Sequence, residues 1–455
     1  MMSLGLVANA LHVPLTGADA RLSGVGTDTR SLAAGDLFVA LVGPNFDGHH
    51  FLPEAIAKGA AGAVLSRALH TPLPYVHVPD TRLALGELAS FWRRQFAIPV
   101  VAVTGSNGKT TVKEMLGTIL AQTGTGCVTR GNLNNDIGLP LTLLRLRAGD
   151  RYAVIEMGMN HAGEIDYLSR LTAPTVAVIT NAAEAHLEGL GSLAQIARAK
   201  GEIFVGLPGD GIAVLNADDP HCELWRALAA PRRCLSFGLD NRADVTAVYE
   251  LGDTGSTIQL RTSHGDSEMR LPLLGKHNVM NALAATAASL AAGATVADVK
   301  TGLERLKVIS GRLELKQGIS GARVIDDTYN ANPGSLTAGL QVLKEAQGER
   351  VLVLGDMAEL GPTAPDIHRR VGELAHSLGV NRLYGIGQLS ALAVKSFGKT
   401  GKHFDTPEAL IDALIDCMHA DMTLLVKGSR VMHMERVVAG IVRRPGETNN
   451  QRGAT

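Results

Sequence analysis

The stretch with the clearest chemical potential reads TGSNGKTT, at residues 104–111. Gly105 and Gly108 allow backbone N–H groups to close around phosphate oxygens, and Lys109 adds a point charge for the β- and γ-phosphates. The Thr110 hydroxyl suits a Mg²⁺ coordination position. The stretch keeps G-x-x-G-K-T but lacks the first glycine of the full phosphate-loop pattern. It therefore predicts a nucleotide polyphosphate site of shortened form.

The residues around this loop indicate how it is held. A β-branched run at residues 100–103 predicts a buried strand, and a helical pattern follows Lys109. The loop would join that strand to a helix N-terminus, where free N–H groups and the helix dipole favour an anion. The alternative is a glycine turn with a solvated lysine. It is disfavoured because a strand, two glycines, a lysine and paired threonines coincide.

Polar side chains also follow other predicted strands. In open α/β sheets ligands bind outside the carboxyl ends of the strands. Each polar residue alone can be explained as a helix cap or a surface group, but several clusters on two sheets favour a cleft with ATP on one wall. The predicted strands are 152–155, 176–179, 323–325, 351–354 and 424–426, and the polar residues after them include Glu156, Thr180, Asn181, His186, Asp327, Asp356, Lys427 and Ser429.

Composition narrows the class of protein. The chain has 455 residues and a formal net charge of −1, so nucleic acid or an acidic membrane surface is not expected as a partner. No apolar run has the length of a membrane span, and the N-terminus does not resemble a signal peptide. The four cysteines show no C-x-x-C spacing, which gives no indication of zinc or a disulfide framework. We expect a cytoplasmic protein without membrane insertion.

Strands that alternate with helices predict an α/β protein with mostly parallel sheets. A chain of this length exceeds one hydrophobic core, and the pattern restarts after Gly311. We therefore predict three domains. They are a small N-terminal α/β domain at residues 1–83, a central ATPase domain at residues 84–312 and a C-terminal Rossmann-like domain at residues 313–455.

Five longer segments resemble the Mur ligases, the ATP-dependent amide-forming enzymes of peptidoglycan precursor synthesis. They are TGSNGKTT from Thr104, GNLNNDIGLPLTLL from Gly131, EMGMNHAGEI from Glu156, TNAAEAHLEGLGSLAQIARAKGEIF from Thr180 and GKHNVMNALAA from Gly275. The shortened phosphate loop is the normal form in that family. The resemblance covers nearly the whole chain except its tail, and it implies a monomer.

Further segments are similar to one branch of that family. DDTYNANPGS from Asp326, LGDMAELG from Leu354 and VKGSR from Val426 resemble the member that adds D-alanyl-D-alanine to UDP-N-acetylmuramoyl-tripeptide. A segment from Asp28 resembles the uridine-nucleotide domain of the same family member. Three alternatives stay open: another amide-forming Mur ligase, folylpolyglutamate synthase, and a non-catalytic ATP-dependent conformational switch. The sequence does not identify the third residue of the tripeptide.

The resemblance implies ATP and two Mg²⁺ ions, with an acyl-phosphate intermediate. The implied catalytic residues are Lys109, His186, Lys200, Arg312 and Asp327. The implied nucleotide-binding residues are Gly105, Ser106, Asn107, Gly108, Lys109, Thr110 and Thr111, with Asn278 on the adenine and Arg312 and Asp327 on the phosphates and ribose. The implied metal ligands are Thr110, Glu156, His186 and Lys200, the last as a carbamate formed with CO₂.

The resemblance also implies substrate contacts. Ser31 and Asn45 would contact the uridine nucleotide, while Asn132, Asn134 and Asn135 would contact the muramoyl peptide or order the magnesium shell. The residues implied for the incoming dipeptide are Tyr329, Asn330, Asp356 and His368, with Lys427 and Ser429 on its carboxylate or on the acyl phosphate.

Overall fold

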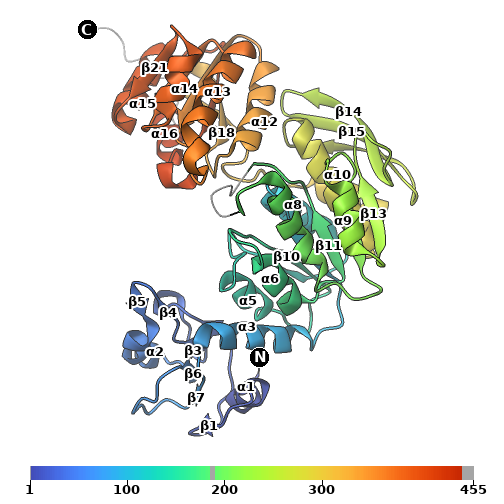
Figure 1. Cartoon of the computed structure of the whole chain (residues 1–455), viewed down its shortest axis with the longest axis vertical. Coiled ribbons are helices and arrows are strands. Elements are labelled where there is room, and N and C mark those ends of the chain that lie inside the picture. Colours follow the sequence, from blue (N-terminus) through green and yellow to red (C-terminus); the bar gives the residue numbers. More distant parts are fainter. Residues whose placement is uncertain (1, 185–189, 443–455) are drawn as a thin grey trace.

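The computed structural model describes residues 2–184 and 190–442, which form three main β-sheets with their own helices. The three α/β units follow one another along an elongated molecule, from the N-terminal unit in blue to the C-terminal unit in orange and red (Figure 1). This confirms the predicted fold class. The domain boundaries at residues 83 and 312 stay a prediction.

The N-terminal unit is a small five-stranded sheet of order β1-β7-β6-β3-β2, in which only the pair of β1 and β7 is antiparallel. Its strands are β1 (Leu15–Thr16), β2 (Val25–Gly26), β3 (Leu37–Val39), β6 (Gly62–Leu65) and β7 (Tyr75–His77), with a separate hairpin of β4 (Val42–Gly43) and β5 (Phe46–Asp47). Its helices are α1 (Leu4–Ala10) and α2 (Leu52–Ala57).

Helix α3 (Thr81–Arg93) leads from this unit to the central one. The side chain of Asp80 caps its N-terminus by accepting the N–H groups of Arg82 and Leu83. The helix packs against α5 (Gly138–Leu143) and α6 (Glu164–Thr172) of the central unit. Helix α3 therefore connects the N-terminal unit to the helix layer of the central unit that contains α5 and α6.

The central sheet has nine strands in the order β16-β15-β14-β13-β12-β11-β8-β10-β9. The strands from β9 to β14 pair in parallel, as predicted, and β15 and β16 extend the sheet with antiparallel pairs. The sequence analysis missed this antiparallel edge. The strands are β8 (Val100–Thr104), β9 (Gly126–Val128), β10 (Tyr152–Glu156), β11 (Val176–Ile179), β12 (Ile212–Asn216), β13 (Arg233–Phe237), β14 (Val245–Gly252), β15 (Gly255–Thr262) and β16 (Ser267–Leu271).

Helices cover both faces of this sheet. Successive side chains of a strand point to opposite faces, so Val101 and Val103 of β8 pack on one helix layer while Val100 and Ala102 pack on the other. The first layer contains α4 (Lys109–Leu120), α10 (Lys276–Ala291) and α11 (Val296–Glu304). The second contains α5, α6, α8 (Leu193–Gly201) and α9 (Cys222–Ala229). Burial on both faces explains the continuous apolar run of β8.

The C-terminal sheet has the order β17-β18-β22-β19-β20-β21, and all its pairs except β17 with β18 are parallel. Its strands are β17 (Glu314–Gln317), β18 (Arg323–Asp327), β19 (Glu349–Gly355), β20 (Arg382–Ile386), β21 (Gly401–Phe404) and β22 (Met422–Lys427). One face carries α12 (Pro333–Lys344), α13 (Ala364–Ser377) and α14 (Ser390–Phe397), and the other α15 (Pro407–Cys417) and α16 (Glu435–Ile441).

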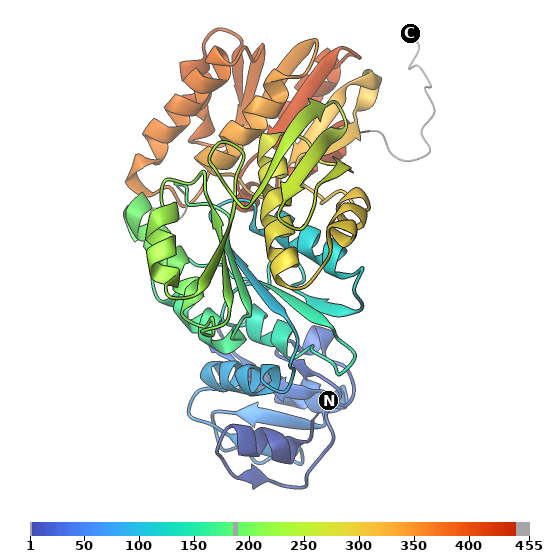
Figure 2. The same ribbon diagram turned by 90° about the vertical axis from the view of Figure 1, so that its right-hand side faces the viewer.

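The β14–β15 hairpin lies beside the C-terminal unit (Figure 2). At this contact the Arg323 guanidinium donates to the Asp253 carbonyl at 3.1 Å. The central and C-terminal units thus meet at this hairpin as well as at the phosphate loop. Within residues 2–184 and 190–442, no helix is both long and apolar enough to cross a membrane.

Candidate active site

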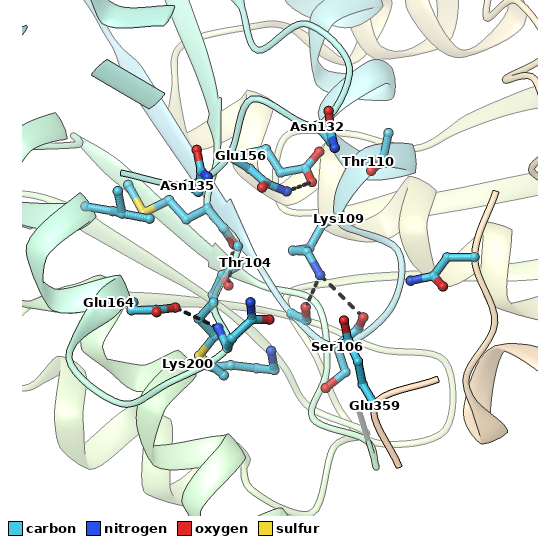
Figure 3. A pocket seen from close by; sticks show the side chains of 18 of the residues that line it. Thr104, Ser106, Lys109, Thr110, Asn132, Asn135, Glu156, Glu164, Lys200 and Glu359 are labelled. Atoms are coloured by element: carbon cyan, nitrogen blue, oxygen red, sulfur yellow. Dashed lines mark hydrogen bonds between the residues drawn. The ribbon is translucent and has the colours of Figure 1, made fainter. Parts of the chain in front are cut away.

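The phosphate loop joins the end of β8 to the start of α4, as the sequence predicts. Gly108 has a φ of +82°, and a β-carbon there would lie 2.2 Å from Oδ1 of Asn281, so both the backbone and the close approach require glycine. The Lys109 ammonium donates to the Gly105 carbonyl at 2.6 Å and lies over the loop (Figure 3). The loop and the N-terminus of α4 together form an anion site.

The substitution Gly108→Ala is expected to abolish nucleotide binding and to lower the free energy of unfolding by about 2 kcal/mol, because alanine is strained at positive φ and its methyl group meets Asn281. Gly293→Ala is the matched control, since Gly293 has a φ of +95° and no atom lies within 4 Å of the added β-carbon. Thermal unfolding and calorimetric titration with ADP would be measured for both variants. Wild-type affinity for ADP in Gly108→Ala would contradict this prediction.

The segment that follows β11 holds the phosphate loop in place. The Ser106 hydroxyl donates to the Ala183 carbonyl at 3.0 Å and accepts the Ala183 N–H at 2.9 Å. The Asn107 N–H donates to the side-chain oxygen of Asn181 at 2.9 Å, and the Asn107 carbonyl accepts from the Thr180 hydroxyl at 2.6 Å. These bonds fix the loop backbone before any ligand binds, which lowers the ordering cost of binding.

A cavity of about 820 Å³ lies in front of the phosphate loop, between the central and C-terminal units (Figure 3). Its size is typical of small-molecule sites. From the central unit it is lined by the loop, Asn132, Asn135, Glu156 and Lys200, and from beyond position 310 by Arg312, Tyr329, Asn330, Glu359 and Ser429. The structure thus brings most of the predicted catalytic and substrate residues to one cleft.

Glu156 ends β10 and is buried at the edge of this cavity. Its Oε1 accepts from the Asn134 amide at 2.8 Å, whereas its buried Oε2 has no hydrogen-bond partner. An unpaired buried carboxylate oxygen is costly unless a cation or donor is supplied from outside the chain. Thr110, the other predicted ligand of this ion, lines the same cavity. The two oxygens fit Mg²⁺, which takes one or two protein ligands and completes its shell with water and phosphate oxygens.

The second predicted metal position is that of His186 and Lys200. His186 lies outside the described residues. Within the described ranges, no group of three or more histidine, cysteine, aspartate or glutamate side chains is arranged to hold a metal ion. A site shared with phosphate oxygens and waters does not require such a group.

Lys200 lies near the end of α8 with its side chain buried and lines the cavity. Burial, and to a lesser degree the positive charge of Lys109, hold the pKa of Lys200 well below its usual range. A lowered pKa favours the neutral form of the amine, which is a nucleophile.

A second cavity of about 260 Å³ lies behind the phosphate loop, against α10. It is lined by Phe237, His277, Asn278, Asp327 and Lys427, among others. The Asn278 amide donates to the Leu274 carbonyl at 2.8 Å and its oxygen accepts from Asn281 at 3.1 Å, so this side chain is fixed within its helix. An apolar ring beside amide groups suits a nucleotide base.

His277 is expected to make the fold less stable in mild acid. Burial and the positive charge of Lys427 lower its pKa from 6.5 to about 4, so the folded protein keeps the ring neutral while the unfolded chain protonates it. The unfolded state binds more protons between these values, so stability present above pH 6.5 is lost as the pH falls toward 4. His277→Asn should show a weaker dependence of its urea midpoint on pH across this window. The exposed His264→Asn variant is the control, and an unchanged pH dependence in His277→Asn would refute this expectation.

Two contacts join the C-terminal unit to the phosphate loop. The Arg312 guanidinium lies 4.1 Å from the Tyr329 ring centroid and donates to the Thr110 hydroxyl at 3.3 Å. The Asn332 amide, which also caps α12, donates to Oδ1 of Asn107 at 2.8 Å. The nucleotide loop and the start of the C-terminal unit are therefore connected directly.

Several residues assigned to the incoming dipeptide form ion pairs or hydrogen bonds within the protein. Lys427 forms a buried ion pair with Asp327 and lines the second cavity rather than the first. Asp356 accepts the N–H groups of Leu389 and Ser390 at the start of α14. These two side chains are bonded within the fold, and their contact with the dipeptide stays a prediction.

His368 is likewise bonded within the fold, and its contact with the dipeptide stays a prediction. It is fully buried in α13, where Nε2 accepts the Met357 N–H at 3.0 Å and Nδ1 bonds to the Ala364 carbonyl at 2.7 Å. Ser429 does line the first cavity, and its hydroxyl accepts the Ala358 N–H at 2.7 Å. Both residues therefore hold the loop after β19, which carries Glu359 into the cavity.

The two predicted uridine contacts lie on the N-terminal unit. Ser31 and Asn45 are exposed, and neither lines the two cavities described above. Asn132 and Asn135 line the first cavity, and Asn135 also accepts the N–H of Gly138 at the start of α5.

Several cavity residues were not selected from the sequence. They are Phe237 and Asn281 of the second cavity, and the ion pair of Arg82 with Asp136 at the far end of the first cavity. Asn134, which was selected from the sequence together with Asn132 and Asn135, holds Glu156. Phe237 ends a strand that the sequence analysis did not predict, so no local pattern indicated it.

Comparison with known proteins agrees with this geometry. Three family models match: the Mur ligase middle domain at residues 103–289, the Mur ligase glutamate ligase domain at residues 311–430 and the Mur ligase family catalytic domain at residues 21–93. The chain is 47% identical over 444 residues to UDP-N-acetylmuramoyl-tripeptide–D-alanyl-D-alanine ligase of Escherichia coli strain K12, covering 97% of this chain and 98% of that protein.

Solved structures are similar as well. A crystal structure of MurF from Acinetobacter baumannii superposes with a TM-score of 0.91 at 38% identity, covering 96% of this chain and 97% of that one. MurF from Thermotoga maritima in complex with ADP gives a TM-score of 0.81 at 28% identity, covering 92% and 96%. The fold and the cleft define an ATP-dependent ligase, in which a nucleotide-phosphate loop faces groups that can activate a carboxylate. Family models over most of the length, together with the 47% identical relative, show that the chain belongs to the Mur ligase family.

Proposed function

We propose that the protein uses ATP to join D-alanyl-D-alanine to UDP-N-acetylmuramoyl-tripeptide, which gives the UDP-N-acetylmuramoyl-pentapeptide precursor of peptidoglycan, ADP and phosphate. The observation that carries this proposal is the 47% identity, over 97% of the chain, to a ligase of that name. The cavity that joins the phosphate loop to Glu156 and Lys200 supports the chemistry.

The reaction proceeds through an acyl phosphate, because a free carboxylate is a poor electrophile. The acceptor carboxylate takes the γ-phosphoryl group of ATP, and the amine then attacks the acyl carbon and displaces phosphate. The charges that converge in these steps are stabilised by Lys109, by the N-terminus of α4 and by Arg312. Contact between the C-terminal unit and the phosphate loop shields the acyl phosphate from water.

The proposal includes two Mg²⁺ ions. Glu156, through its unpaired oxygen, and the Thr110 hydroxyl would hold the first. His186 and the carbamate of Lys200 would hold the second. When bound, the ions supply positive charge to the phosphate oxygens.

The chemistry of Lys200 supports the carbamate. A neutral buried amine can attack CO₂: a nitrogen–carbon bond forms, one proton is released, and the cation of a free lysine is replaced by an anion. Burial and Lys109 both favour the neutral amine, and the Lys109 cation then favours the carbamate over the free amine. The product is a metal ligand at a position where a lysine ammonium would repel the metal.

The donor dipeptide would lie between Glu359 and Arg430. Among the described residues that line the first cavity beyond position 312, Glu359 is the only carboxylate, and its φ of +62° is rare for a side chain of this type. The anchoring of Met357 and Ala358, described above, holds this conformation. A carboxylate and a guanidinium with uncharged amides such as Asn330 between them suit a zwitterionic dipeptide.

The remaining assignments follow the three domains proposed at residues 1–83, 84–312 and 313–455. The uridine nucleotide would bind the first, through Ser31 and Asn45. The muramoyl peptide would extend past Asn132 and Asn135, and adenine would occupy the second cavity beside Asn278 and Phe237. The third domain would supply the donor site.

Phosphate release from ATP tests the proposal, with UDP-N-acetylmuramoyl-tripeptide and D-alanyl-D-alanine omitted in turn. Release that requires both substrates, with the pentapeptide nucleotide as product, is the expected result. Release with a single amino acid, or with folate and glutamate, would assign the chain to a sister activity. No stimulation by any of them would favour an ATP-dependent switch.

A further inference from the structure

Lys113 is a buried charge that the proposed reaction does not use. It lies one helical turn after Lys109 in α4, and its side chain is fully buried. Its ammonium donates to the Thr129 carbonyl at 3.0 Å and pairs with Oε1 of Glu114 at 2.6 Å. Because the Glu114 side chain is 42% exposed, the ion pair adds little stability, whereas burial of the Lys113 charge costs free energy. Stability alone therefore does not account for this lysine.

Thr129 links Lys113 to the proposed metal carboxylate. It follows β9 and is the first residue of the asparagine-rich segment at residues 129–135. Its N–H donates to the Val154 carbonyl at 3.0 Å. Its hydroxyl accepts the N–H of Glu156 at 3.0 Å. Asn134, five residues further along the same segment, donates to the carboxylate of Glu156 at 2.8 Å. The segment that starts at Thr129 therefore holds Glu156 by its backbone and by its side chain.

We propose that Lys113 is a positioning residue for Glu156, acting through the segment of residues 129–134. Its ammonium fixes the carbonyl of Thr129, and the hydroxyl of the same residue fixes the backbone of Glu156. Because the orientation of a metal-binding carboxylate depends on the groups behind it, loss of the Lys113 charge should weaken metal binding without removing any ligand. This inference rests on the proposed function, since it assumes that Glu156 binds Mg²⁺.

The test is Lys113→Met, which keeps the length of the side chain and removes its charge. ADP affinity would be measured by calorimetry with and without Mg²⁺. We expect the metal-free affinity to stay as in wild type, and the gain from Mg²⁺ and the turnover number each to fall by about tenfold or more. Lys307→Met, at an exposed position of the same domain, is the control. Thermal unfolding would show that the variant is folded.

A Mg²⁺-dependent gain in ADP affinity equal to that of wild type would overturn the inference. If Lys113→Met does not fold, Thr129→Val tests the same link, because it removes the hydroxyl that accepts the Glu156 N–H. We expect it to lose the Mg²⁺-dependent gain as well, and wild-type behaviour would again overturn the inference. The ADP measurement needs no peptide substrate. Failure of the proposed function would instead appear as absence of the pentapeptide product with the wild-type protein.

Discussion

Lys200→Ala should lower turnover about a thousandfold, the range expected when one preorganised electrostatic group is lost from an active site. The side chain is buried beside the phosphate loop, and burial and the charge of Lys109 lower the pKa of its amine. As a carbamate it would supply an anionic metal ligand, which alanine cannot. Formate or acetate should partly restore activity by occupying the space of the missing carboxylate. The readouts are turnover with and without these acids, and ADP affinity, which should be retained.

Two further variants sharpen this test. Lys200→Arg keeps a cation but cannot form a carbamate, so it should be as inactive as the alanine variant. Arg198→Ala changes an exposed residue of the same helix and should behave as wild type. Labelled CO₂ followed by nuclear magnetic resonance should give a carbamate signal in wild type that is absent from both Lys200 variants. Normal turnover of Lys200→Ala would eliminate the two-metal mechanism.

Glu156→Gln is expected to reduce turnover by a similar factor, about a thousandfold. Glutamine has the shape of glutamate and can still accept the Asn134 amide, but it places an NH₂ group where the unpaired Oε2 now lies. The variant should fold normally, because that oxygen has no partner within the described chain. It should bind ADP with little or no gain on addition of Mg²⁺. Calorimetry of ADP binding across a series of Mg²⁺ concentrations measures this effect separately from turnover.

Two other variants show whether the loss of turnover is specific to the Glu156 carboxylate. Asn134→Ala leaves the charge of Glu156 but removes its hydrogen-bond donor, so a smaller loss of about tenfold or more is expected. Glu87→Gln, an exposed position of α3, should have no effect. Equal losses in Asn134→Ala and Glu156→Gln would show that orientation, rather than charge, limits the reaction.

The strongly patterned elements were predictable from sequence. The strands at 152–155, 176–179 and 424–426 are apolar runs bounded by polar residues, and the phosphate loop combines a buried strand, two glycines and a helix start. The antiparallel edge of β14, β15 and β16 was missed, and with it the direction of the hairpin toward the C-terminal unit. Its side chains alternate between partly buried and exposed positions, so no continuous apolar run indicates it.

The roles of the residues around the loop after β19, which carries Glu359, were predictable only in part. Asp356, His368 and Ser429 are bonded to the loop after β19 or to the segments beside it, and their roles toward the dipeptide stay predictions. Whether a side chain faces the ligand or the loop itself depends on hydrogen bonds across tens of residues, such as that of Ser429 with Ala358. A sequence pattern contains no information on these distances.

The sequence by itself determined the α/β class, the anion-binding phosphate loop and the residue types needed to activate a carboxylate, because these depend on local periodicity and on side-chain chemistry. Only the tertiary structure decided which polar groups are left unpaired. The second carboxylate oxygen of Glu156 has no protein partner within residues 2–184 and 190–442, whereas Asp356 and His368 are satisfied by backbone groups. Burial makes an unpaired polar group costly, and burial is set by how the three units pack together.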